Sequence, residues 1–142
     1  MTPLETAGAE RFLADFLTSF TDEVLGGGDP APIVDRYYTP DAVQVADGVS
    51  IDREKLIAHV GPLRKNLLSS RVEVHEALAN GNRIAARLTL HGQLRKRALS
   101  TEVHFFGEFT PDGRMCRAHQ LTRTLAADPT VEREEVAAGA GR

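Results

Sequence analysis

The sequence is poor in the features that mark several common classes of protein. Its 142 residues include one cysteine and no tryptophan, and aromatic residues make up 6% of the chain. A single cysteine excludes an internal disulfide and any metal site built from several thiolates. The formal net charge is −3, so the chain lacks the basic surplus typical of proteins that bind nucleic acid or an anionic membrane.

Long apolar stretches are missing as well. No run approaches the roughly 18 residues that span a bilayer, and the N-terminus lacks the basic and apolar regions of a secretory signal. The five histidines fall on one predicted helix and four predicted strands, without an i, i+4 pair or a short chelating loop, so we expect no metal site. No motif implies an organic cofactor. We therefore expect a cytoplasmic protein without nucleic-acid or membrane partners.

What the sequence does contain is a helical first half. Residues 10–25 carry apolar side chains at helical spacing, and a run of three glycines ends this predicted helix. A second helix is expected over 30–38, because an Asp-Pro pair at its start supplies a cap and a suitable first residue. A third is expected to begin at Asp52, which can act as an N-cap.

From about residue 70 onward the apolar period changes from helical to alternating. Four strands are predicted over 71–78, 82–94, 100–109 and 115–125, and a shorter strand with an Asp-Gly bend is predicted over 41–51. Helices grouped before strands indicate an α+β fold, with three N-terminal helices packed on a curved, mainly antiparallel sheet of four to six strands. We expect one domain over 1–125 and, from its small and charged residues, a flexible tail over 126–142.

This order of elements resembles the nuclear-transport-factor-2-like superfamily, the cone-shaped α+β fold of ketosteroid isomerase, limonene epoxide hydrolase and the SnoaL-like polyketide cyclases. The segments GGGDPAPIVDRYYTPDAVQV, VSIDREKLIAHV and FTPDGRMCRAHQLTR carry the resemblance. It implies a cyclase, isomerase, dehydratase or epoxide hydrolase that uses acid–base chemistry on a hydrophobic, oxygenated small molecule. The alternative is a non-catalytic ligand-binding or dimerisation module, because this fold hosts many activities.

The acids that these relatives use in catalysis are largely missing from the chain. Ketosteroid isomerase keeps a general-base aspartate shortly after the segment that resembles PDAV, and that position falls at Ala46, or at Asp47 if the bend slips by one residue. Its second, protonated aspartate falls at Phe105, and the aspartate of the cyclases falls at Arg123. The resemblance therefore leaves Asp47 as the one matching acid.

Strand alternation predicts which side chains face the inside of the cone. In the superfamily the Phe105 position faces inward. The same alignment places Cys116, Ala118, Gln120 and Thr122 of the last strand on the inner face. Glu76 shares the inward-facing side of its own strand with Val72 and Val74. Asp47 could instead serve only the Asp-Gly turn, and a buried lone cysteine is usually a small apolar group. We predict catalytic roles for Asp47, Tyr38 and Gln120, and substrate contacts for Phe105, Phe109, Thr122, Glu76 and Cys116.

The opposite face of the last two strands carries charged residues interrupted by Phe106 and Leu121. Opposite charges across an antiparallel pair fit an outer sheet face, and a catalytic role for some of them is the alternative. The charged set comprises Glu102, His104, Glu108, Arg117, His119 and Arg123. Because Phe106 and Leu121 should not stay bare on a monomer, we expect a homodimer formed through this face.

Overall fold

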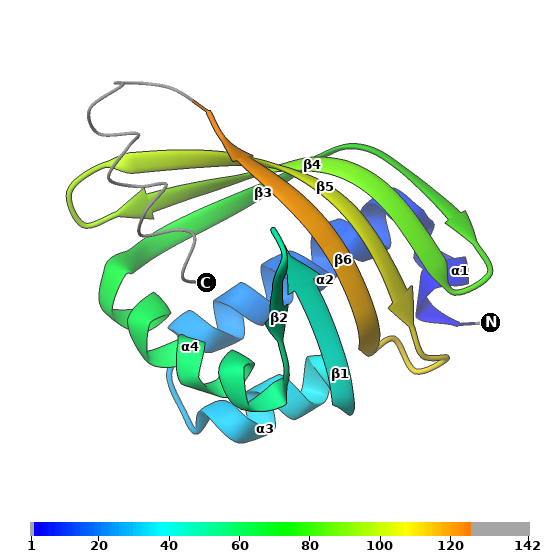
Figure 1. The fold of residues 1–142 in the computed structure, drawn as a ribbon, viewed down its shortest axis with the longest axis horizontal. Helices are drawn as coiled ribbons and strands as arrows, with labels where there is room; N and C mark the ends of the chain where they lie inside the picture. Colours follow the sequence, from blue (N-terminus) through cyan, green and yellow to red (C-terminus); the bar gives the residue numbers. More distant parts are fainter. Residues whose placement is uncertain (1, 126–142) are drawn as a thin grey trace.

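A six-stranded sheet curls around one long helix (Figure 1). The computed structural model of the chain describes residues 2–125, so the tail predicted over 126–142 lies outside the described residues. The strands lie in the order β2 (Val49–Ile51), β1 (Tyr38–Ala46), β6 (Met115–Thr124), β5 (Ala98–Phe109), β4 (Arg83–Leu94) and β3 (Leu67–Asn80). Neighbours are antiparallel except β1 and β6, which run parallel. The predicted α+β cone is confirmed.

Helices cover the concave side of this sheet (Figure 1). The three predicted helices are present as α2 (Ala9–Leu25), α3 (Pro30–Tyr37) and α4 (Arg53–Asn66), and a short α1 (Pro3–Ala7) precedes them. The side chains of Asp29 and Asp52 accept hydrogen bonds from the first turns of α3 and α4, as N-caps do. These two caps fix the residues at which α3 and α4 begin.

Aromatic side chains fill the narrow end of the cone. The ring of Phe109 meets those of Phe12 and Phe16 edge to face, with centroids 4.9 and 5.3 Å apart. Phe16 also meets the ring of Tyr38 at 5.8 Å. Such pairs contribute roughly 0.5–1.5 kcal/mol each beyond the apolar area that they bury. These ring contacts fix the N-terminal half of α2 to the sheet.

A bulge in β3 reverses the predicted orientation of Glu76. The pairing of β3 with β4 shifts between Val74 and Glu76, so that one residue is extra and alternation starts again after it. Val74 packs on the core, but after the bulge it is Ala77 that does so. Glu76 instead forms an exposed ion pair with Arg87 at 3.1 Å. The prediction that Glu76 faces the pocket is wrong.

A second bulge changes the position of Cys116. Glu108 pairs with Arg117 and Phe109 pairs with Met115, which leaves Cys116 as the extra residue. Its sulfur lies 3.4 Å from the carbonyl oxygen of Glu108 and 4.0 Å from Oε2 of the same residue, on the outer face. Burial and the neighbouring Glu108 carboxylate raise the pKa of this thiol. The prediction that Cys116 faces the inside of the cone is wrong.

Candidate functional site at the open end of the cone

The inner surface of the sheet becomes more exposed from one end of the cone to the other. Along β6, Met115 and Ala118 are buried, whereas Gln120 and Thr122 are partly exposed. On β4 the change comes between the buried Leu88 and the partly exposed Leu90. We call this more exposed region the open end. Partly buried apolar side chains pack around the main core: Leu17, Phe20, Ile57, Val72, Val74 and Leu90.

Gln120 is the central polar group of the open end. It lies between Ala46 on β1 and Phe105 on β5. The backbone carbonyl of Gln120 accepts a hydrogen bond from the Asp47 N–H at 3.0 Å. No residue from 2 to 125 is hydrogen-bonded to its side-chain amide, so two donors and an acceptor remain for a ligand.

Asp47 joins the turn after β1 to the end of β6. Its φ of 51° and that of Gly48, 81°, build a tight hairpin turn. The carboxylate accepts hydrogen bonds from the Thr122 N–H at 2.8 Å and from the Thr122 hydroxyl at 2.5 Å. The structure therefore brings together three of the predicted site residues, Asp47, Gln120 and Thr122. Asp47 forms the turn and also places a carboxylate beside the open end.

Tyr38 lies deeper than the sequence suggested. The side chain is buried against Phe16 and Phe20 and its hydroxyl is hydrogen-bonded to the side chain of Gln44. Burial raises the pKa of Tyr38 above its usual range, so the hydroxyl stays protonated. Gln44 belongs to the inner face of β1 and is partly exposed. Tyr38 is thus placed to orient Gln44 rather than to touch a ligand.

The two phenylalanines predicted to contact a substrate, Phe105 and Phe109, are core residues. Phe105 and Phe109 are 3% and 1% exposed, and both belong to the main core. Phe105 pairs with Gln120 across the strands, but its ring lies over Gly107, on the side toward the narrow end. Phe109 lies at the narrow end among the rings of α2.

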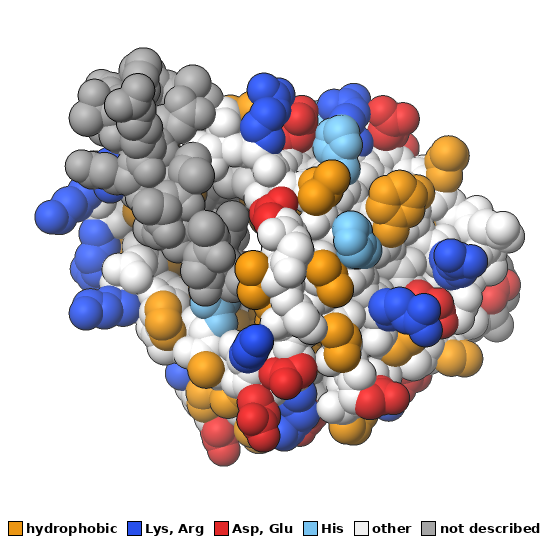
Figure 2. Space-filling model, viewed as in Figure 1, with side chains coloured by type: hydrophobic (Ala, Val, Ile, Leu, Met, Phe, Trp, Pro, Cys, Tyr) orange, Lys and Arg blue, Asp and Glu red, His pale blue; other side chains and the backbone are white. Residues whose placement is uncertain are grey.

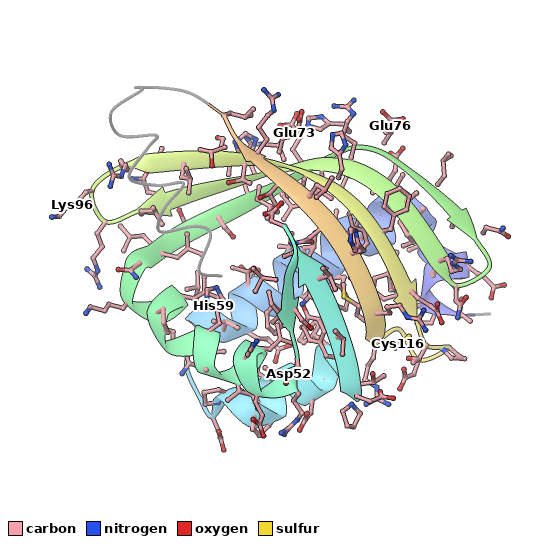
Figure 3. All side chains as sticks on the ribbon, in the orientation of Figure 1. Asp52, His59, Glu73, Glu76, Lys96 and Cys116 are labelled. Carbon is pink, nitrogen blue, oxygen red and sulfur yellow. The ribbon has the colours of Figure 1, made fainter. Side chains whose placement is uncertain are left out.

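His59 is a candidate that strand-based reasoning missed. It is partly buried and lies three residues after Leu56 and four before Leu63, so the three share one face of α4. Leu56 packs on the main core and Leu63 on the neighbouring cluster, which turns this face inward. Figure 3 shows His59 on the side of α4 toward the sheet. The signal in the sequence is its helical spacing with the two leucines.

In the part of the chain that the structure describes, no group of three or more His, Cys, Asp and Glu side chains has a geometry that could hold a metal ion. Nor does any described helix have the length and apolarity needed to cross a membrane.

Comparison with known proteins identifies the family. The profile of the SnoaL-like domain matches residues 9–118. A search of curated protein sequences finds no match. Among solved structures, the BvnE pinacolase of Penicillium brevicompactum aligns over 91% of each chain with a TM-score of 0.63 and 12% identity.

Two other similar structures carry the same fold. An LEH-like epoxide hydrolase of M. tuberculosis aligns over 80% of this chain and 81% of its own, with a TM-score of 0.62 and 17% identity. A ketosteroid isomerase-like protein of Catenulispora acidiphila, solved with trimethylamine, aligns over 80% and 85%, with a TM-score of 0.58 and 10% identity. The chain belongs to the SnoaL-like domain family, within the nuclear-transport-factor-2-like superfamily.

Proposed function

We propose that the protein is a cofactor-independent enzyme that takes a largely apolar, oxygen-bearing small molecule into the open end of the cone. The observation that carries this proposal is the amide of Gln120, which faces inward without a hydrogen-bond partner among the described residues. Half-buried apolar side chains such as Leu90 and Ile57 pack on the same core cluster as Phe105. An apolar wall with a few convergent polar groups is the usual composition of a small-molecule site.

The roles of the polar groups follow from their positions. The Gln120 amide would donate a hydrogen bond to a carbonyl, hydroxyl or epoxide oxygen, and Gln44, oriented by Tyr38, would offer a second polar contact. Donors aimed at an oxygen stabilise negative charge that develops there. Asp47 or His59 would then move the proton, which contributes roughly 10²–10⁴-fold to a rate. Phe105 and Thr122 would contact the body of the substrate.

The class of reaction is supported by the similar structures. They include an epoxide hydrolase and a pinacolase, and the IdmH protein of Streptomyces antibioticus, a proposed polyketide cyclase, aligns over 87% of this chain with 14% identity. The first two names describe chemistry at carbon–oxygen bonds. We propose acid–base chemistry of that kind for this chain, by isomerisation, cyclisation, dehydration or epoxide opening.

An amide substitution tests this proposal. Purified protein is incubated with a panel of apolar epoxides, vicinal diols and hydroxyketones, and products are followed by chromatography. For any substrate that is turned over, Gln120→Leu should reduce kcat/KM at least tenfold, because the ligand oxygen loses its donor, while Tm stays nearly unchanged. Gln93→Leu, which removes an exposed amide on β4, is the matched control and should keep activity. Equal effects of the two changes would contradict the role of Gln120.

A second proposal concerns the outer face of the sheet, which we expect to form a homodimer. Phe106, Leu121 and Leu78 are 63%, 59% and 76% exposed there. Phe106 and Leu78 line a groove of about 1090 Å³ together with Val43 and Arg117. Figure 2 shows hydrophobic and histidine side chains interleaved over β5 and β6 on this face. Exposed apolar surface of this kind is typical of an interaction site, and it also supports the alternative of a dimerisation module.

A further inference from the structure

Three side chains on the outer face of the sheet are joined in a row by hydrogen bonds. His91 on β4 pairs with Ser100 on β5, and its Nδ1 lies 2.8 Å from the Ser100 hydroxyl oxygen. Its Nε2 lies 2.9 Å from Oε1 of Glu73 on β3. Leu90, which precedes His91, packs on the main core, so His91 points to the other face of the sheet. We call Glu73, His91 and Ser100 the outer triad, and Figure 3 shows Glu73 on the side of the sheet away from the helices.

The contact with Glu73 determines which nitrogen of His91 carries the proton. The hydrogen bond from His91 holds the pKa of Glu73 below its usual 4.5, so this side chain is a carboxylate at neutral pH. Because a carboxylate only accepts hydrogen bonds, His91 Nε2 carries a proton and donates it. In the neutral imidazole Nδ1 is then an acceptor, and the Ser100 hydroxyl donates to it. A serine that donates to a histidine oriented by a carboxylate is the arrangement of an activated nucleophile.

A positive side chain lies within reach of the same hydroxyl. Arg123 on β6 pairs with Glu102, which lies two residues beyond Ser100 on β5, so Arg123 is a diagonal neighbour of Ser100. Diagonal neighbours lie roughly 7–8 Å apart, within reach of a long side chain. Arg123 donates from Nε and Nη2 to Glu102 at 3.3 and 3.2 Å, which leaves further N–H groups of the guanidinium for another oxygen. It can therefore donate to an oxygen on which negative charge develops during acyl transfer.

We propose that Ser100 is a nucleophile that takes a short acyl group from an activated ester. His91 is its base, Glu73 orients the imidazole, and Arg123 stabilises the negative charge on the carbonyl oxygen. The Ser100 oxygen forms a bond to the carbonyl carbon while its proton passes to Nδ1 of His91. The bond from that carbon to the leaving alcohol then breaks, and the alcohol takes the proton. Water attacks the acyl-serine in the same way, which releases the carboxylic acid and restores the hydroxyl.

This site is separate from the open end and from the proposed dimer contact. Ser100 and Gln120 lie on opposite faces of the sheet. Along β5, Ser100 is six residues from Phe106, or about 20 Å. The neighbours of Ser100 on its own face of β5 are Ala98 and Glu102, which are small or polar, so the site fits a short acyl group and lacks an apolar wall for a larger one. Its chemistry does not depend on a ligand in the open end.

Labelling with a fluorophosphonate tests the nucleophile. The activated serine oxygen bonds to phosphorus, fluoride leaves, and peptide mass spectrometry locates the label. Ser100 should react at least tenfold faster than Ser50, an exposed serine on β2. His91→Gln should slow labelling of Ser100 at least tenfold, because base catalysis contributes roughly 10²–10⁴-fold, whereas His119→Gln, at an exposed histidine on β6, should not. Equal rates at the two serines, or a rate that His91→Gln leaves unchanged, would overturn the proposal.

Hydrolysis of p-nitrophenyl acetate tests the acyl transfer. Mass spectrometry of the wild type during turnover should find acetyl on Ser100. Ser100→Ala should lower the rate of nitrophenol release at least tenfold while Tm stays nearly unchanged. Release that survives this change, or acetyl found only on lysines, would overturn the acyl step.

Nitrogen-15 spectra of His91 test the positioning role of Glu73. The wild type should show the tautomer with the proton on Nε2. In Glu73→Ala both tautomers should be populated and the labelling of Ser100 should slow severalfold, because the acceptor that selects one tautomer is gone. Glu76→Ala, which removes an exposed carboxylate paired with Arg87 on the same two strands, should change neither. A wild type with the proton on Nδ1 would overturn the proposal.

Discussion

Gly107 shows how closely one residue on the inner face is constrained by its neighbour. It is buried on β5, two residues after Phe105, and a Cβ added there would overlap the Phe105 ring. We expect Gly107→Ala to lower the free energy of unfolding by about 1–3 kcal/mol, since the ring must leave its place in a packed core. Urea denaturation followed by circular dichroism measures this difference.

A second glycine provides the control for that substitution. Gly61 lies inside α4, and a Cβ added there meets nothing within 4 Å apart from its neighbours in the chain. Gly61→Ala should change the free energy of unfolding by less than about 1 kcal/mol, because the higher helix propensity of alanine is opposed by contact of its Cβ with the ring of Pro62. If both variants lost the same stability, the Phe105 ring would not be the cause of the effect at Gly107.

For single side chains, alternation along a strand predicts the face on which a residue lies only where the strand has no bulge. The placement of Gln120, Thr122 and Phe105 on one face follows from alternation along unbroken strands. Glu76 and Cys116 were placed on the wrong face because each follows or forms a bulge. A single extra residue reverses the parity of everything after it, and no local pattern in either segment marks the bulge. The contact of Asp47 with Thr122 depends on pairing between β1 and β6 across 75 residues, which periodicity does not reveal.

At the scale of elements, two charged contacts fix the helices to one another. Glu23 on α2 accepts hydrogen bonds from Tyr37 and Arg36 on α3, and Asp35 on α3 accepts two from Arg53 on α4, at 2.7 and 3.0 Å. The Tyr37 hydroxyl and the Arg36 guanidinium hold the pKa of Glu23 below its usual 4.5, and Arg53 holds that of Asp35 below 3.8. Both contacts stabilise the carboxylate form.

These shifts predict how acid affects the fold. A carboxyl whose pKa is lower in the folded state stabilises the fold above its unfolded pKa, and that contribution is lost as pH falls through the folded value. The double variant Glu23→Gln/Asp35→Asn should therefore be less stable than the wild type at pH 7 and approach it below about pH 3. Thermal unfolding across this pH range measures the difference.

A matched variant separates this effect from a general loss of charge. Asp22→Asn removes an exposed carboxylate on α2 that belongs to neither contact. Its curve of Tm against pH should run parallel to that of the wild type. A double variant that kept the full acid dependence of the wild type would show that these carboxyls do not contribute it.

At the scale of the whole molecule, the sheet has two faces with different proposed roles. The inner face holds the core and the open end, while the outer face exposes Phe106 and Leu121. We expect the wild type to sediment as a dimer at micromolar concentration and Phe106→Glu/Leu121→Glu to sediment as a monomer, because buried like charges would oppose the interface. Val49→Glu, at an exposed apolar residue on β2, should stay dimeric. A wild type that is monomeric at these concentrations would contradict this proposal.

The most direct test of the central claim, that the open end binds an apolar oxygenated molecule, is a nuclear magnetic resonance titration with a bicyclic ketone such as decalone. Side-chain amides and leucine methyl groups report both faces of the sheet in one experiment. The Gln120 amide and the Leu90 methyl groups should shift together and saturate, while the methyl groups of Leu121 and Leu78 on the outer face stay unchanged. Shifts confined to Leu121 and Leu78, or no shift at Gln120 at any ketone concentration, would contradict the account.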